Sequence, residues 1–407
     1  GGWERQINGI SNNEKAVLLL EKRTFKELLV DMELRNLQNN IVGQEASRLF
    51  ARAEINMGVE AFRDSLYSLL KRNTFLNIKF ENMLDTLGEI SRTDIRSLLG
   101  EWEKTTSLPF YSLGEPTLTK ITNKGGEEFF VLKMLISNNS DYDGIIHMDI
   151  RKDGWWYQPL EDPRAKTKIE MPAHTSKEFV SVWEDQIRNV EINTMVSGNL
   201  PNIISQDINN VKQERNKIVK DSIYILPESS FDLPGEIIVD NEDSTLFILS
   251  APPIVGLLPK WLDEVEETPF KYSGISWWRP PLQWTATTND RYYGKYIRSA
   301  FVIKSGDGSQ TATWKVPVPE VGQYDLYYHV FKDDELRWNN NLQGEYHFKV
   351  KYGSEVEDAY VNLRKANEGW EQLGSYYFDS DTIRVVLTDE CKLRSVTADA
   401  VKIVKRY

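Results

Sequence analysis

Cysteine and long apolar runs are almost missing from this chain of 407 residues, which contains a single cysteine, Cys391. One cysteine excludes an internal disulfide and the zinc frameworks that are built from several cysteines. No histidine lies near Cys391 in the sequence, so we expect an ordinary thiol there and not a nucleophile. No apolar stretch approaches the roughly 20 residues of a membrane helix, so we expect no membrane span. The first residues lack a basic segment followed by an apolar one, so we expect no signal peptide.

Histidine and net positive charge are also scarce. The four histidines are His147, His174, His329 and His347, and none of them belongs to a His-Glu-x-x-His motif. Without that motif the chain lacks the zinc ligands and general base of a metallopeptidase. We therefore predict no catalytic residue, no metal site and no cofactor. Lys and Arg number 49 against 61 Asp and Glu, a net charge of −12. Nucleic acid is not expected as a partner, because binding phosphates requires a basic field.

The first quarter of the chain has the periodicity of amphipathic helices. Apolar residues recur at helical spacing between residues 13 and 105, separated by charged residues. We predict a bundle of roughly four to six helices over residues 1–108.

Part of this helical region has a recognisable order of motifs. Met57-Gly-Val-Glu-Ala-Phe62 is followed by Phe75-Leu-Asn-Ile78 and then by Glu101-Trp102 and Leu108-Pro109. This order resembles the closing helices of the catalytic domain in gluzincin zinc aminopeptidases, and the likeness extends over about residues 43–200 if the following strands are included. The resemblance implies a peptidase-like region, but the zinc site of that family is missing.

The periodicity changes from helix to strand after Pro109. Runs of alternating or continuous apolar residues predict strands, and they end at Gly, Asn and Asp turns; they lie at residues 116–121, 128–136, 144–150, 179–183 and 190–194. We predict a small β-sandwich over residues 109–200. Residues 201–235 are interpreted as a linker, because the stretch from Val211 to Lys220 is dense in charge and typical of a solvated helix or connection.

The C-terminal part carries a second series of strands. Residues 375–378, 382–387 and 400–404 are rich in aromatic and β-branched residues, with polar breaks between them. Together with Trp277-Trp278, Tyr292-Tyr-Gly294 and Val316-Pro-Val-Pro319, the order Trp370-x-x-Leu-Gly-x-Tyr-Tyr-Phe378 resembles golvesin-like domains, which are also found beside xanthan-lyase-type enzymes. The resemblance covers about residues 236–407, with an insertion near residues 251–273, and implies an extracytoplasmic location. The predicted fold is therefore α+β and multidomain, with an N-terminal helical bundle followed by two antiparallel β-sandwich domains.

Aromatic residues supply the candidate ligand site. Sugars stack their C–H faces on aromatic rings, while charged side chains at the edge bind hydroxyl groups. The candidates are Trp277, Trp278, Trp284, Tyr292, Tyr293, Trp338, Arg279 and Arg291. Packing in a core is the competing explanation, and we expect it for Trp314, Tyr324 and Trp370, which occupy strand positions. Asp399, flanked by alanines, is expected to accept a backbone hydrogen bond and not to act as a catalytic acid.

Three functions remain open at this point. The first is a non-catalytic extracytoplasmic scaffold or interaction region of a larger cell-envelope protein, such as the soluble tail of a peptidase-like domain fused to a transporter. The second is a carbohydrate-binding module that assists polysaccharide degradation, and the third is a polysaccharide lyase or hydrolase. The partners expected from these hypotheses are a polysaccharide or another envelope protein.

Overall fold

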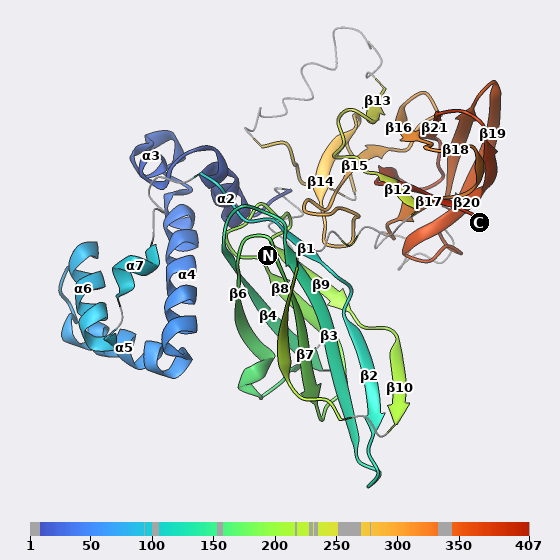
Figure 1. The fold of residues 1–407 in the computed structure, drawn as a ribbon. Helices are drawn as coiled ribbons and strands as arrows, with labels where there is room; N and C mark the ends of the chain where they lie inside the picture. Colours follow the sequence, from blue (N-terminus) through green and yellow to red (C-terminus); the bar gives the residue numbers. More distant parts are fainter. Residues whose placement is uncertain are drawn as a thin grey trace. The chain divides into compact units, whose positions relative to one another are not determined.

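The computed structural model describes residues 9–92, 94–99, 106–152, 158–215, 218–227, 231, 235–250, 270–276, 278–332 and 344–406. These residues fall into two compact units, one formed by residues 12–231 and the other by residues 1–11 together with 232–407. Helices are followed by antiparallel sheets along the chain (Figure 1). The predicted α+β class, with helices before two β-sandwiches, is confirmed.

The helices belong to the first unit and follow local sequence signals. Thr24 and Glu27 form a capping box at the start of one helix, and Gly58, with φ of +83°, separates two others. In the part of the chain that the structure describes, no helix is both long and apolar enough to cross a membrane. The helices are α2 (Asn12–Lys22), α3 (Phe25–Val30), α4 (Gln38–Met57), α5 (Val59–Arg72), α6 (Phe80–Ser91) and α7 (Ile95–Leu99).

Two kinds of contact hold the helices in this unit. Leu49, Phe62 and Leu87 belong to an apolar cluster shared by α4, α5 and α6. The side chain of Glu14, on α2, is fully buried and accepts a hydrogen bond of 3.0 Å from the backbone N–H of Asn202, which lies in the β-sandwich. A hydrogen bond between a buried carboxylate and a backbone N–H fixes the position of the helix and contributes stability. The helices therefore pack onto the sandwich and do not form a free-standing bundle.

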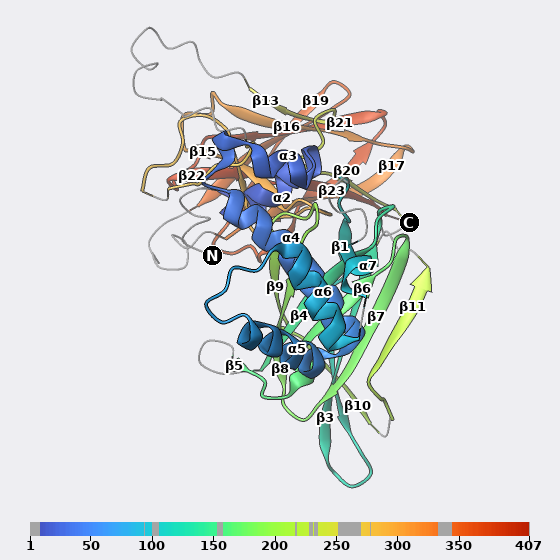
Figure 2. The ribbon, with the colours of Figure 1, turned by 90° about the vertical axis from the view of Figure 1, so that its left-hand side faces the viewer.

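The β-sandwich of the first unit consists of two sheets (Figures 1 and 2). One sheet has the order β10-β2-β3-β7-β11, with β1 beside β3, and the other has the order β5-β4-β8-β9, with β6 beside β4. Apolar residues from alternate positions of both sheets, including Leu132, Ile146, Trp183 and Ile192, fill the space between them. The strands are β1 (Tyr111–Leu113), β2 (Thr117–Thr122), β3 (Glu128–Asn138), β4 (Gly144–Lys152), β5 (Gln158–Pro159), β6 (Lys166–Met171), β7 (Thr175–Trp183), β8 (Ile187–Asn193), β9 (Ile203–Asp207), β10 (Val211–Arg215) and β11 (Ser222–Pro227).

The interpretation of residues 201–235 as a linker is wrong. Three strands, β9, β10 and β11, lie in this segment and complete the first sandwich. The charge-dense stretch from Val211 onward forms β10, which pairs in parallel with β2 at a sheet edge and exposes four of its five residues. Solvent exposure on both faces of an edge strand explains the charges that suggested a linker.

The second unit contains the golvesin-like series of strands in three sheets. Their orders are β12-β23-β17-β20, β13-β16-β21-β18-β19 and β14-β15-β22. The strands are β12 (Glu236–Val239), β13 (Phe247–Leu249), β14 (Thr285–Thr288), β15 (Ser299–Lys304), β16 (Thr311–Pro317), β17 (Gly322–Val330), β18 (Glu345–Tyr352), β19 (Glu355–Asn362), β20 (Gly369–Phe378), β21 (Thr382–Thr388), β22 (Ser395–Ala398) and β23 (Val401–Lys405).

A single apolar core joins these sheets. Trp314 on β16 is fully buried, and its ring lies 5.3 Å from Phe247 and 6.2 Å from Tyr328. Alternate residues of β17, beginning with Tyr324, point into the same core. The residues between them, among them Tyr327 and His329, therefore face the other side of the sheet. This alternation places the side chains of the candidate site described below.

Candidate functional site

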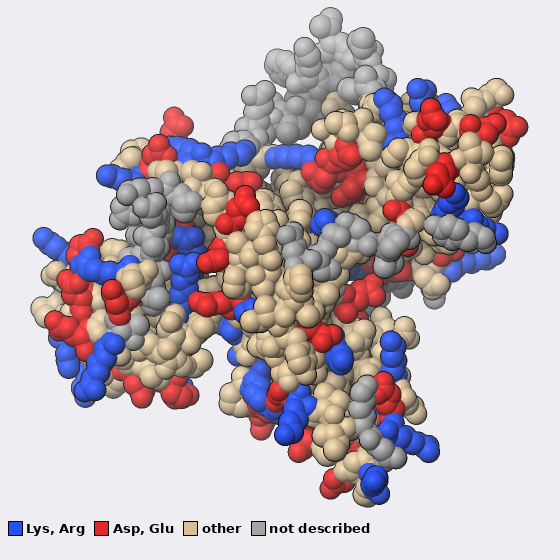
Figure 3. Space-filling model, in the orientation of Figure 1, with Lys and Arg blue, Asp and Glu red and all other residues tan. Residues whose placement is uncertain are grey.

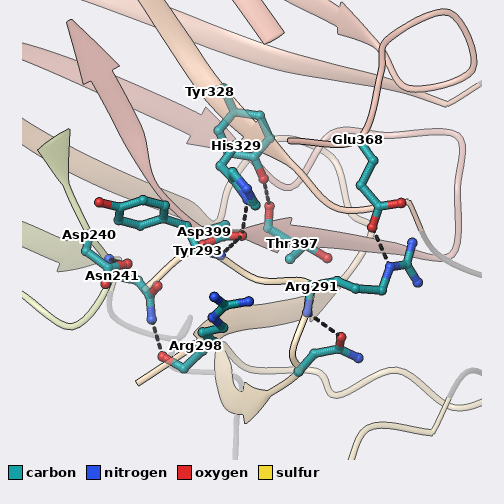
Figure 4. A network of polar contacts seen from close by, with 12 residues as sticks. Asp240, Asn241, Arg291, Tyr293, Arg298, Tyr328, His329, Glu368, Thr397 and Asp399 are labelled. Atoms are coloured by element: carbon teal, nitrogen blue, oxygen red, sulfur yellow. Dashed lines mark hydrogen bonds and ion pairs between the residues drawn. The ribbon is translucent and has the colours of Figure 1, made fainter. Parts of the chain in front are cut away.

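The candidate site is built around Asp399, which lies between β22 and β23 and has no solvent exposure. Its carboxylate accepts the backbone N–H of Tyr293 at 3.2 and 3.1 Å, and one oxygen lies 2.9 Å from Nδ1 of His329. The backbone oxygen of Asp399 accepts the indole N–H of Trp314 at 3.2 Å. Figure 4 shows His329 and the Tyr293 backbone converging on this carboxylate. Asp399 therefore acts as a hydrogen-bond partner of the backbone, as expected.

The loop that carries Tyr293 is shaped by its own sequence. It joins β14 to β15, and the Asn289 side chain accepts the backbone N–H of Arg291 at 3.0 Å, which forms a tight turn. Gly294 has φ of +155°, and a Cβ at this position would lie 1.9 Å from the backbone oxygen of Ile297. Only glycine fits such a close approach. The turn and the glycine together bring the Tyr293 N–H to the buried carboxylate.

Three rings meet outside Asp399. His329 and Trp370 lie opposite each other on β17 and β20, with their ring centroids 5.1 Å apart. The Tyr293 ring lies 5.1 Å from Trp370 and 5.8 Å from His329. Lys402, on β23, holds its ammonium 4.8 Å from the centre of the Trp370 ring. We call Tyr293, His329, Trp370 and Lys402 the aromatic cluster.

The cluster is half-buried and its charges are compensated. The side chain of His329 is 13% exposed, and Lys402 pairs with Glu236 at 3.0 Å. Arg291, which neighbours Tyr293 in sequence, forms an ion pair with Glu368 (Figure 4) and donates to the backbone oxygen of Lys332 at 2.6 Å. The rings of the cluster are therefore held in fixed orientations, with polar groups at their edges.

Two carboxyl groups near the cluster have perturbed acidity. Burial raises the pKa of Asp399, while His329 acts in the opposite direction. Burial also raises the pKa of Asp240 well above its ordinary value, and the negative charge of Asp399 adds to this effect. Asp240 directly follows β12 (Figure 4). No group of His, Cys, Asp and Glu in the described ranges has the arrangement of a metal site.

The pair of Asp399 and His329 can be compared with two members of a catalytic triad. An aspartate that accepts from Nδ1 of a histidine orients the ring, as in hydrolase triads. A triad also requires a nucleophile at the other ring nitrogen, and within the described residues no hydroxyl or thiol is hydrogen bonded to it. Asp399 is sealed from solvent, so its carboxyl cannot touch a substrate. Its contacts hold His329 and Tyr293 in place.

The predicted site residues are dispersed in the structure. Tyr292 is buried against Phe331, and Trp284 packs against the core, where its indole nitrogen is buried without a partner among the described residues. Trp278 and Arg279 are exposed, with the guanidinium of Arg394 lying 4.9 Å from the Trp278 ring centre. Among the predicted site residues that the structure describes, only Tyr293 belongs to the aromatic cluster, and Arg291 contacts Glu368 and Phe331.

Three of the cluster residues were not among the predicted site residues. Trp370 was expected in the core, yet it lies half-buried beside His329. Strand alternation shows which residues of β17 face away from the core. Once the pairing of β17 with β20 is known, the same alternation places Trp370 beside His329. Trp277 and Trp338 lie outside the described residues.

The fold of this unit is that of an antiparallel β-sandwich with an attached three-stranded sheet. Residues 280–405 match the family model of the golvesin C-terminal domain. The predicted golvesin-like domain is thereby confirmed for these residues, which include Tyr293, His329, Trp370 and Asp399. No curated protein matches the chain.

Several solved structures share partial similarity with the chain. Xanthan lyase from Paenibacillus is 16% identical with a TM-score of 0.30, and the match covers 74% of this chain and 26% of the lyase. For β-glucuronidase from Bacteroides uniformis the identity is 12%, the TM-score 0.22 and the coverage 78% and 32%. Aminopeptidase A from Legionella pneumophila is 17% identical with a TM-score of 0.15, over 31% of this chain and 14% of the peptidase. The chain thus spans a third or less of each of these proteins.

Proposed function

We propose that this chain is a non-catalytic, extracytoplasmic interaction region of a larger cell-envelope protein, and that its golvesin-type unit binds polysaccharide through the aromatic cluster. The observation that carries this proposal is the contact of the Tyr293, His329 and Trp370 rings above a buried carboxylate. Rings held at fixed angles provide stacking surfaces for sugar rings without further loss of side-chain entropy. The His329 and Lys402 side chains supply hydrogen-bond donors at the edge.

Two features favour binding over catalysis. Asp399, the carboxyl that contacts the His329 ring, has no exposure. Glycoside cleavage by the common mechanism uses two carboxyl groups that reach the scissile bond from either side. A polysaccharide lyase requires a base that reaches the sugar ring, and His329 is fixed through Nδ1 by a buried partner. The arrangement is suited to recognition.

The remaining elements of the proposal come from family likeness. Xanthan lyase, one of the solved structures with partial similarity, acts on a polysaccharide, which agrees with a polysaccharide ligand here. The golvesin-type match supports the proposed extracytoplasmic location. The helices before the first sandwich are proposed to be the end of a gluzincin-like domain that lacks its zinc site, in keeping with the motifs between Met57 and Pro109.

Tryptophan fluorescence during titration with a panel of acidic and neutral polysaccharides tests the binding, and absorbance of unsaturated uronate product tests for cleavage. We expect a saturable change for the wild type without product. Trp370→Ala should weaken binding by roughly 2- to 12-fold, since one stacked ring contributes on the order of 0.5–1.5 kcal/mol.

Trp278→Ala is the matched control, because it removes an exposed tryptophan of the same unit that lies outside the cluster. It should bind like the wild type. Equal losses of affinity in Trp370→Ala and Trp278→Ala would mean that the ligand binds outside the aromatic cluster. Accumulation of product would overturn the non-catalytic assignment. The absence of any response to the whole panel would remove polysaccharide as the ligand.

A further inference from the structure

A row of three cations crosses the sheet β13-β16-β21-β18-β19. Lys315 on β16 lies directly opposite Arg384 on β21, and Arg384 lies directly opposite Lys351 on β18. Their neighbours in sequence, such as Trp314, Ile383 and Val350, are fully buried, so the three cations face outward from the same side of the sheet. Neighbouring strands lie about 4.8 Å apart, so the row extends over about 10 Å. We call Lys315, Lys351 and Arg384 the basic row.

The basic row has no acidic partners among the residues that the structure describes. Within the described residues, none of the three side chains takes part in an ion pair or a side-chain hydrogen bond. Lys349, two residues before Lys351 on β18, faces the same way; Asp358 lies opposite it on β19, but no ion pair of Lys349 is formed within the described residues. Elsewhere in this unit, cations such as Lys402 and Lys405 pair with carboxylates. On the face visible in Figure 3, basic and acidic side chains are interspersed.

Such a row is unfavourable for the isolated protein. Like charges on directly opposite strand positions destabilise a sheet. At physiological ionic strength the screening length is about 8 Å, so cations one strand apart still repel each other. The chain carries a net charge of −12, yet the two carboxylates on this face, Asp358 and Glu390, bond His347 and not the basic row. The arrangement is therefore explained better by an external anion than by the stability of the fold.

An aromatic surface continues the same face. His347 on β18 stacks on Tyr360 of β19 with ring centroids 4.8 Å apart and planes 8° apart. The imidazole is held between Asp358 at 2.7 Å and Glu390 at 3.3 Å, and Tyr360 is 55% exposed. The face thus combines free cations with a flat, fixed ring beyond them.

We infer that this sheet face is a second binding surface, separate from the aromatic cluster, and that it takes an acidic polysaccharide whose charged groups repeat along the chain. The three cations in line match a linear polyanion, and the Tyr360 ring offers a stacking surface for a sugar. Nucleic acid fits less well, since an acidic protein with a short row of cations lacks the broad basic field that phosphate backbones require.

The binding of polygalacturonate to the full chain tests this surface, with dextran as the neutral polymer. The triple variant Lys315→Gln, Lys351→Gln, Arg384→Gln should weaken polygalacturonate binding by roughly 3- to 100-fold, as expected for three exposed charge contacts. Added salt should likewise weaken the binding of polygalacturonate to the wild type. Dextran binding should not respond to the variant.

The control triple Lys304→Gln, Lys365→Gln, Lys392→Gln changes the net charge equally. These lysines are exposed and lie outside the strands of this sheet. The control should retain wild-type affinity for polygalacturonate. An equal loss of affinity in both triple variants would show that net charge alone explains the effect, and it would overturn the inference. Tighter binding of a single-stranded oligothymidylate than of polygalacturonate would also overturn it.

The experiments distinguish a failure of the proposal for the basic row from a failure of the proposal for the aromatic cluster. A loss of polygalacturonate binding in Trp370→Ala but not in the triple variant of the basic row would overturn the row and leave the aromatic cluster standing. The reverse pattern would support the row and count against the cluster. Melting curves check folding, and the triple variant should melt no lower than the wild type, because it relieves repulsion between like charges.

Discussion

Removal of the Asp399 carboxylate should destabilise the golvesin-type unit selectively. In Asp399→Ala the Tyr293 N–H loses its acceptor and His329 loses its partner at Nδ1. An unsatisfied buried donor costs about 1–3 kcal/mol, and a hydrogen bond to a charged group contributes about 1.5–3 kcal/mol. Burial raises the pKa of Asp399, so the wild type already bears a desolvation cost that the variant escapes. The expected net loss is about 2–4 kcal/mol.

Calorimetry of the full chain is the appropriate assay, because the two compact units are expected to give separate transitions. For a unit of this size the loss corresponds to a decrease in melting temperature of roughly 5–15 °C in one transition only. The isosteric Asp399→Asn is the control, since its amide oxygen still accepts the Tyr293 N–H, and it should lose less. An unchanged melting temperature in Asp399→Ala would refute the role assigned to this carboxylate.

Two further substitutions test buried acids in the two units. The folded pKa of Asp240 is raised by burial and by Asp399, so the wild type loses stability as the pH rises from about 4 through that raised value. The Asp240→Asn variant should therefore have a higher melting temperature than the wild type at neutral pH, and its melting temperature should depend less on pH. A melting temperature that depends more strongly on pH would contradict this expectation. In the first unit, Glu14→Ala leaves the Asn202 N–H without its acceptor and should cost about 1–3 kcal/mol, whereas Glu14→Gln should recover part of it in chemical denaturation.

Much of the fold could be predicted from the sequence because its strands carry local signals. The apolar and β-branched run at residues 382–387 lies within β21, and Trp314 and Tyr324 are core residues as expected. The helices follow from 3.6-residue periodicity and from caps such as that at Thr24. The strand β10 was missed because an edge strand exposed on both faces shows no alternation.

The candidate site could not be predicted in the same way, because its residues are distant in sequence. His329 meets Trp370 across a strand pair and Asp399 across the end of another strand. The cluster of tryptophans and tyrosines near residue 290 was visible in the sequence, but only Tyr293 among its described members faces the site. Composition indicates which rings are present, whereas strand register decides which side of the sheet each ring faces.

The central claim is that the aromatic cluster binds a polysaccharide without cleaving it. Hydrogen exchange of the full chain, with and without each polysaccharide of the panel, tests it most directly when the polymer length is measured in the same samples by size-exclusion chromatography. We predict slower exchange around Tyr293, His329 and Trp370 with at least one polymer whose length stays unchanged. The claim would be contradicted if no polymer changed the exchange rates at these residues, or if a polymer became shorter.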